Sequence, residues 1–128
     1  MVKKTVLIIE DDPDILETIE LVLSGMNIHV MSAPEALLTT EIYTLSPDLI
    51  LLDHWLHNKL GGDLCLAIKT DPFTKKIPII MMSADLNIAN VARYSLADAY
   101  LAKPFDVDKL ISLTQQFLGE EVGSWEVK

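Results

Sequence analysis

Residues 6–14 read VLIIEDDPD, a short apolar run that ends abruptly in acidic residues and a proline. Three further apolar runs end on a polar residue in the same way: 49–53 (LILLD), 78–83 (PIIMMS) and 100–103 (YLAK). Continuous apolar runs of this length are typical of strands buried on both faces of a parallel sheet. Ligands bind beyond the carboxyl ends of such strands. We therefore expect one pocket to contain the carboxylates that end the first two runs, the hydroxyl of Ser83 and the ammonium of Lys103. Such a pocket suits a cation and a phosphoryl group.

Segments of helical period alternate with the apolar runs. The patterns predict strands at 6–9, 29–31, 49–52, 77–82 and 99–102, and helices from Pro13 to about residue 23, 34 to about 43, 63–69, about 86–96, and 107–118. Alternation of this kind implies right-handed crossovers and a sheet covered on both faces. The predicted fold is therefore α/β: a doubly wound, five-stranded parallel sheet in three layers.

Length and composition narrow the class of protein further. The chain has 128 residues, half of them apolar, which suits one domain, predicted here as residues 1–120, followed by a flexible tail at 121–128 that contains Trp125. The net charge of −9 argues against direct binding of nucleic acid. No apolar run approaches the roughly 20 residues that span a bilayer, so we expect a cytoplasmic protein without membrane insertion. The single cysteine, Cys65, is expected to be a buried, inert thiol.

Carboxylates at neighbouring strand ends are the strongest chemical signal. If Glu10, Asp11 and Asp53 lie close together, they cannot all stay ionised without a nearby cation, and an oxygen-only ligand set favours Mg²⁺. The alternative is that the acidic run after the first strand merely caps a helix. An EF-hand is excluded, because the glycine and glutamate that its loop requires are missing. Beside the cation, Lys103 can neutralise phosphoryl charge and Ser83 can donate a hydrogen bond.

Four stretches, 6–14, 47–53 (PDLILLD), 77–84 (IPIIMMSA) and 97–105 (ADAYLAKPF), together resemble the receiver domain of two-component response regulators. The resemblance covers residues 3 to about 118. It implies a flavodoxin-like fold with strand order 2-1-3-4-5 and a stand-alone, chemotaxis-type receiver. It also implies these residue roles: Asp53 as phosphoacceptor; Asp11, Asp53, the Trp55 backbone carbonyl and, through water, Glu10 as ligands of Mg²⁺, with Mn²⁺ as an alternative ion; Lys103 as phosphoryl-binding lysine; Ser83 and Tyr100 as switch residues; and a cis bond before Pro104.

The function implied by this resemblance is a signalling switch rather than a conventional enzyme. A histidine kinase or phosphotransfer protein would phosphorylate Asp53, and the receiver would catalyse its own Mg²⁺-dependent dephosphorylation. Phosphorylation would shift a pre-existing equilibrium on the face made by the fourth helix, fifth strand and fifth helix, which a downstream protein reads. A phosphorylation-dependent dimer is a further expectation.

Some positions depart from the family pattern. His57 stands where proline is common, Leu60 where an acidic or amide residue often precedes the glycine, and Leu96 where glycine is common; Trp55 is unusually bulky. The pair His54 and His57 also raises a transition-metal alternative.

Three other functions remain as alternatives. A phosphorylation-independent pseudo-receiver would act as a protein-interaction module with the same fold. A flavodoxin-like cofactor protein would need phosphate-binding donors where this chain has acids. An aspartate-based phosphohydrolase would need a substrate pocket, usually with a cap domain.

Overall fold

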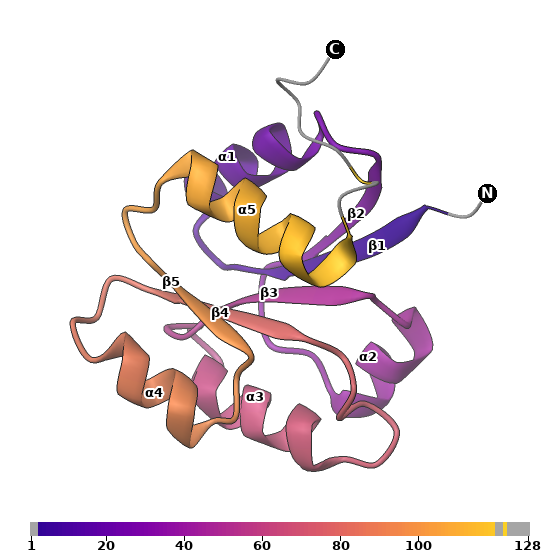
Figure 1. Cartoon of the computed structure of the whole chain (residues 1–128). Coiled ribbons are helices and arrows are strands. Elements are labelled where there is room, and N and C mark those ends of the chain that lie inside the picture. The colour runs from indigo at the N-terminus through magenta and orange to yellow at the C-terminus, as the bar shows by residue number, and fades with distance from the viewer. Residues whose placement is uncertain (1–2, 120–121, 123–128) are drawn as a thin grey trace.

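Five parallel strands form a single sheet in the order β2-β1-β3-β4-β5 in the computed structural model, which describes residues 3–119 and 122 (Figure 1). The elements are β1 (Lys4–Ile9), α1 (Pro13–Leu23), β2 (Ile28–Ala33), α2 (Thr39–Leu45), β3 (Leu49–Asp53), α3 (Gly61–Thr70), β4 (Ile79–Ser83), α4 (Ile88–Tyr94), β5 (Ala99–Ala102) and α5 (Val107–Leu118). The predicted fold class and strand order are confirmed.

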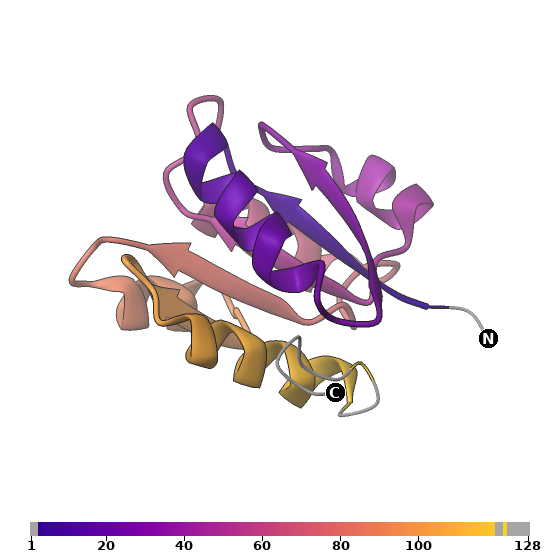
Figure 2. The ribbon, with the colours of Figure 1, turned by 90° about the horizontal axis from the view of Figure 1, so that it is seen from above.

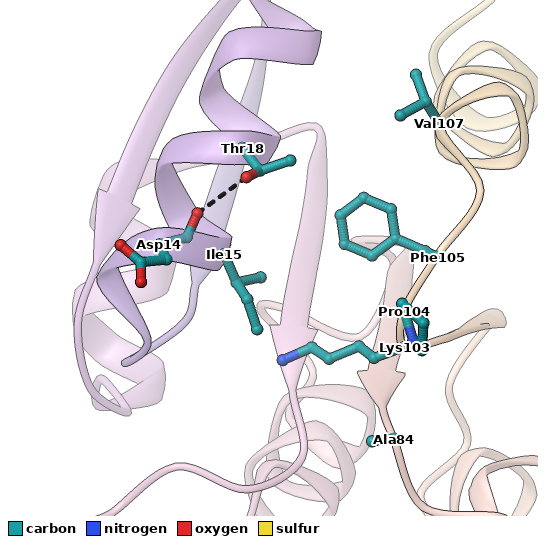
Figure 3. A pocket seen from close by; sticks show the side chains of 8 residues that line it. All are labelled: Asp14, Ile15, Thr18, Ala84, Lys103, Pro104, Phe105 and Val107. Atoms are coloured by element: carbon teal, nitrogen blue, oxygen red, sulfur yellow. Dashed lines mark hydrogen bonds between the residues drawn. The ribbon is translucent and has the colours of Figure 1, made fainter.

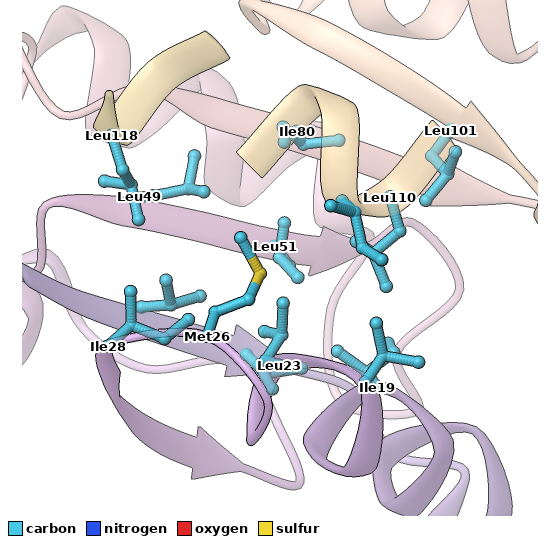
Figure 4. Packing of buried hydrophobic residues seen from close by; sticks show 14 of the residues in the cluster. Ile19, Leu23, Met26, Ile28, Leu49, Leu51, Ile80, Leu101, Leu110 and Leu118 are labelled. Carbon is cyan, nitrogen blue, oxygen red and sulfur yellow. The ribbon is translucent and has the colours of Figure 1, made fainter. Parts of the chain in front are cut away.

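Helices cover both faces of the sheet, α1 and α5 on one face and α2, α3 and α4 on the other (Figures 1 and 2). Alternate residues of each strand point to opposite faces, so Val6 and Ile8 join one buried cluster while Leu7 and Ile9 join the other. The first cluster, drawn in Figure 4, packs the sheet against α1 and α5. The two-sided burial explains why the strands are apolar without alternation.

The predicted bounds of α1, β5 and α5 are confirmed residue for residue or nearly so. Asp12 caps α1 by accepting hydrogen bonds from the N–H groups of Asp14 and Ile15, and Pro13 occupies the first helical turn, where its missing N–H costs nothing. Asp106 caps α5 in the same way through the N–H of Asp108. In these segments a local capping signal and the apolar periodicity agree.

The helix predicted from Pro34 to about Tyr43 is wrong over its first half. β2 continues to Ala33, residues 34–38 are not helical, and α2 begins only at Thr39. The backbone N–H and carbonyl of Ala36 bond the side chain of Asn58 instead of helical partners. The backbone N–H of Leu38 donates to Glu41 Oε1 (2.8 Å), which fixes the later start of the helix.

Two other helices differ from their predicted bounds. α3 starts at Gly61 rather than at residue 63, and α4 covers only 88–94 of the 86–96 expected. After α4, Leu96 adopts a positive φ of 66°, which residues other than glycine rarely do. This is the position where the resemblance led us to expect glycine and the chain has leucine.

The chain beyond α5 returns to the core at Val122. This residue, which the sequence prediction assigned to a flexible tail, is 2% exposed and belongs to the first cluster. Its carbonyl accepts a hydrogen bond from Asn27 N (2.8 Å). The other residues of the predicted tail, including Trp125, lie outside the described residues. Within the described ranges no helix has the length and apolarity needed to cross a membrane.

Candidate functional site

The polar residues that end the strands meet at one edge of the sheet, as predicted. Glu10 directly follows β1, Asp53 ends β3, Ser83 ends β4 and Lys103 follows β5. Parallel register brings them level, with Asp53 beside Met82 and Ser83 beside Ala102. Their positions therefore follow from strand length and pairing alone.

Lys103 is the centre of the charged contacts at this edge. Its Nζ donates to Glu10 Oε1 (2.7 Å) and to Asp53 Oδ1 (3.0 Å). Burial lowers the pKa of Lys103, but hydrogen bonds to the two carboxylates outweigh it, so that the pKa is raised and the ammonium form is favoured. Burial raises the pKa of Glu10, against the opposing effect of Lys103. The peptide bond between Lys103 and Pro104 is cis, as the resemblance implied.

Three carboxylates cluster at this edge, and two of them bond Lys103. One oxygen from each of Glu10, Asp11 and Asp53 lies within 4.8 Å of the others. The local charge is therefore negative even with Lys103 in place, and the donor atoms are all oxygens. This set fits Mg²⁺, which is typically held by one or two carboxylates together with waters and phosphate oxygens.

The two predicted switch residues differ in exposure. Ser83 is fully buried, and its Oγ accepts a hydrogen bond from Asp85 N (3.0 Å). Tyr100, on β5, is 45% exposed. Ser83 thus lies at the same strand edge as the charged residues, whereas the Tyr100 side chain reaches solvent.

The loop after Asp53 contributes contacts that sequence reasoning missed. The backbone N–H of His57 donates to Asp11 Oδ2 (3.1 Å), and its ring Nδ1 lies 3.4 Å from the same atom. Asn58 bonds the backbone of Ala36, 22 residues away in the chain. No periodicity or motif marks contacts between two loops, so only the folded chain reveals them.

The histidines of this loop do not form the metal site considered as an alternative. His54 is buried, and its Nδ1 accepts a hydrogen bond from Gly62 N (3.0 Å). Within the described ranges, the one group of three or more potential metal-binding side chains contains no histidine. Trp55 is 55% exposed, and its ring lies edge-on to the His54 ring, with centroids 4.8 Å apart.

Gly61 allows α3 to begin directly against the end of β3. A Cβ at this position would overlap the backbone carbonyl of Asp53 and lie 2.7 Å from His54 Cα. The N–H of Gly61 donates to the carbonyl of His54. Any larger residue would therefore push against the strand end that carries Asp53.

An apolar cavity of about 470 Å³ opens beside Lys103. Figure 3 shows it between α1 on one side and the segment leading into α5 on the other, with the Lys103 side chain crossing between them. Its lining includes Ile15, Ala84, Phe105 and Val107. The charged cluster thus borders a surface that could accept apolar side chains of another molecule.

Two curated relatives match most of this chain. The regulator RpaA of Synechocystis, named a DNA-binding dual master transcriptional regulator, is 33% identical over 116 residues, which make up 88% of this chain and 48% of RpaA. The phosphate regulon transcriptional regulatory protein PhoB of Pseudomonas aeruginosa is 35% identical over 115 residues, 88% of this chain and 50% of PhoB. The chain thus spans about half the length of these curated relatives.

Among solved structures, a chain from Chloroflexus aurantiacus assigned as a response regulator has a TM-score of 0.82 at 32% identity, covering 91% of this chain and 98% of that one. Chemotaxis protein CheY4 of Vibrio cholerae has a TM-score of 0.77, covering 91% and 100% of the two chains. At 20% identity, the latter likeness concerns the fold alone.

Fold and site together define a doubly wound domain with an acidic pocket beside a lysine. A family model described as the response regulator receiver domain matches residues 6–115, and the chain belongs to that family. Receiver domains interact with histidine kinases or phosphotransfer proteins and bind Mg²⁺ at an acidic pocket. In this chain the acidic cluster is Glu10, Asp11 and Asp53.

Proposed function

We propose that this protein is a phosphorylation-dependent switch in which Asp53 accepts a phosphoryl group from a phosphohistidine of a kinase or phosphotransfer protein. The observation that carries the proposal is the contact of Lys103 Nζ with both Glu10 and Asp53, next to the third carboxylate of Asp11. This arrangement joins a carboxylate nucleophile, a cation site and a fixed positive charge, the three elements that phosphoryl transfer requires.

The reaction proposed for Asp53 is an in-line displacement. A carboxylate oxygen of Asp53 attacks phosphorus, the O–P bond forms as the N–P bond to the donor histidine breaks, and the leaving nitrogen takes a proton from solvent. Lys103, held by Glu10, stays within reach of the charge on the transferred phosphoryl oxygens. Glu10, Asp11, Asp53 and the Trp55 carbonyl would hold Mg²⁺, which supplies further positive charge when bound.

Autodephosphorylation returns phosphorylated Asp53 to the free carboxylate without the donor protein. Water attacks the phosphorus, the O–P bond to Asp53 breaks, and inorganic phosphate leaves while the carboxylate is restored. Trp55 follows Asp53 by two residues and is 55% exposed, and its ring is proposed to limit the approach of that water. Trp55→Ala is expected to shorten the lifetime of the phosphorylated form, measured by release of phosphate; an unchanged lifetime would count against shielding.

The phosphodonor is proposed to dock over the cavity between α1 and the start of α5. Val107, 37% exposed, lies at its rim. Val107→Glu should slow transfer from a protein donor but leave the reaction with a small acyl phosphate unchanged, because the small donor needs no docking surface. If the wild type and Val107→Glu accept the phosphoryl group from a protein donor at equal rates, this docking site is excluded.

Signal output is proposed to pass through α4, β5 and α5. Phosphorylation would draw the Ser83 hydroxyl toward the phosphoryl oxygens and let Tyr100, now exposed, turn inward. Amide hydrogen exchange before and after phosphorylation tests this: protection should change in α4 and β5. Changes confined to the strand ends around Asp53 would contradict it.

The central test is incubation with Mg²⁺ and a small acyl phosphate, followed by intact mass measurement and mapping of the adduct. The wild type should gain one phosphoryl group on Asp53, and Asp53→Asn should gain none. Asp108→Asn, which makes the same chemical change at an exposed position of α5, is the matched control and should react like the wild type. Absence of an adduct on the wild type would instead support a phosphorylation-independent interaction module.

A further inference from the structure

We propose that Asn58 is a positioning residue for the metal site: it fastens the loop at 54–60 to the segment before α2 and so keeps Asp11 oriented. The inference rests on the proposed function, because it concerns the same acidic cluster. Within the described residues, the hydrogen bonds of the Asn58 side chain are with Ala36 and not with the three clustered carboxylates. Its action is through its neighbour His57.

Asn58 and Ala36 form a reciprocal pair of hydrogen bonds. Asn58 Oδ1 accepts from the N–H of Ala36 (3.0 Å), and Asn58 Nδ2 donates to the carbonyl of Ala36 (3.3 Å). Both polar groups of the side-chain amide and both of one backbone residue are used. Two such bonds fix orientation as well as distance, which a single bond does not.

The segment to which Asn58 bonds is itself held in place by packing against the core. Ala36 and Leu37 pack against the second hydrophobic cluster, beneath α2 and α3. Next to the Asn58 contact, His57 Nε2 lies 3.2 Å from Glu35 Oε1. Two consecutive loop residues, His57 and Asn58, thus lie against two consecutive residues of a segment held by the core.

The other end of this connection is Asp11. The backbone N–H of His57 donates to Asp11 Oδ2 at 3.1 Å, with the His57 ring Nδ1 3.4 Å from the same oxygen. Within the described residues, the hydrogen bonds and ion pairs of the Asp11 side chain are all with His57. Since the Asp11 side chain is 24% exposed and not packed into the core, its direction depends on where this N–H lies.

Adjacency makes the two contacts interdependent. Asn58 follows His57 directly, so the bonds to Ala36 restrict the position of the peptide whose N–H holds Asp11. Trp55, whose carbonyl is the proposed backbone ligand, belongs to the same short loop. Loss of the Asn58 amide should therefore let both the Asp11 carboxylate and the Trp55 carbonyl depart from the geometry that a cation needs.

Mg²⁺ affinity is the direct test. In a Trp125→Phe parent, titration of Trp55 fluorescence with MgCl₂ should show a Kd about 10-fold weaker for Asn58→Ala, the low end of the loss seen when supporting contacts of a metal ligand are removed. Asn90→Ala is the matched control, because the Asn90 contacts stay within α4 and its cap. It should leave the Kd unchanged.

Two further measurements separate positioning from a general loss of structure. The Ala36 amide should exchange several-fold faster in Asn58→Ala, while amides of β1 and β3 keep their protection. His57→Ala, which keeps the backbone N–H on Asp11, should change the Kd by less than about threefold, because the backbone donor rather than the ring orients Asp11.

The outcomes distinguish this inference from the proposed function. If the parent binds Mg²⁺ and Asn58→Ala binds it equally well, Asn58 has no positioning role and the proposed function stands. If His57→Ala weakens binding as much as Asn58→Ala, the ring and not the Asn58 bonds holds Asp11, and the inference is overturned. If the parent shows no response to Mg²⁺, the proposed metal site fails and the inference fails with it.

Discussion

Two lysines lie at opposite edges of the sheet with nearly equal burial, and the charges around them differ. The side chains of Lys69 and Lys103 are 11% and 13% exposed. Lys69, at the edge where β4 and β5 begin, donates to Asp98 Oδ2 (2.9 Å) and to the carbonyl of Ile77 (3.0 Å). Asp98 Oδ2 also accepts a hydrogen bond from Ile79 N (2.8 Å). Each charged group of this ion pair thus contacts one opposite charge and one backbone group.

Lys103 meets an excess of negative charge instead. It contacts two carboxylates directly, and a third, from Asp11, belongs to the same cluster. Buried charges that are not balanced cost stability unless a further cation arrives. A buried lysine therefore does not by itself mark a site; the imbalance of charge around it does.

The largest expected difference between the two edges is in phosphoryl transfer. Lys103→Met should slow formation of the Asp53 adduct about 100-fold, because a fixed charge beside the transferred group is lost. Lys69→Met should leave the rate within about twofold, because Lys69 lies at the other edge. Time courses by intact mass give both rates, with circular dichroism confirming that each variant is folded. Similar losses in both variants would break the distinction.

Lys69 should matter for stability although it does not matter for phosphoryl transfer. Lys69→Met is expected to lower the free energy of unfolding by about 3 kcal/mol, at the low end for a broken buried pair because the Asp98 side chain is 33% exposed and keeps its bond to Ile79. Urea denaturation measures the change. Lys59→Met, at an exposed position, is the control and should stay within about 0.5 kcal/mol of the wild type.

The Cys65 thiol lies close to the ion pair of Lys69 and Asp98. Its titration tests how well this edge of the sheet is shielded from water. Burial raises the pKa of Cys65 from 9.0 to about 11, against a hydrogen bond with Ser95 that lowers it. The folded protein then holds a proton that the unfolded chain releases, so this contribution is complete below pH 9 and is lost as pH rises toward 11. Between pH 8 and 10 we expect a loss of roughly 1 to 2 kcal/mol that Cys65→Ala lacks. Parallel pH profiles for the two proteins would refute the shift.

The smallest effect is stabilisation by Mg²⁺. At five times its Kd, the ion should raise the free energy of unfolding by about 1 kcal/mol through mass action. The same increment is expected in Lys69→Met, whereas Asp11→Asn should lose most of it. Urea denaturation with and without MgCl₂ measures each increment. An increment in Asp11→Asn equal to that of the wild type would place the ion elsewhere.

Sequence patterns predicted well which residues lie at the charged edge, because the position of each is set by the end of a single strand. Asp53, Ser83 and Lys103 end apolar runs, and parallel pairing then brings them level. The α5 bounds were equally predictable, because the Asp106 cap and the apolar stripe mark the same segment.

The parts that sequence could not predict depend on contacts between distant loops. Pro34 followed by Glu35, Ala36 and Leu37 has the composition of a helix start, yet the Ala36 backbone is bonded by a side chain 22 residues away. Local propensity is worth little against such contacts. The hydrogen bond from His57 to Asp11 was hidden for the same reason, since 46 residues separate them.

The return of the chain at Val122 sets a practical limit on how this domain can be transplanted. A chimera joined directly after Leu118 would remove the carbonyl that pairs with Asn27 and a buried side chain from the cluster beneath α1 and α5. Junctions to a foreign module therefore belong beyond residue 122, even though the family match ends at residue 115. Gene fusions designed from the alignment alone would leave the hydrophobic interior open at that corner.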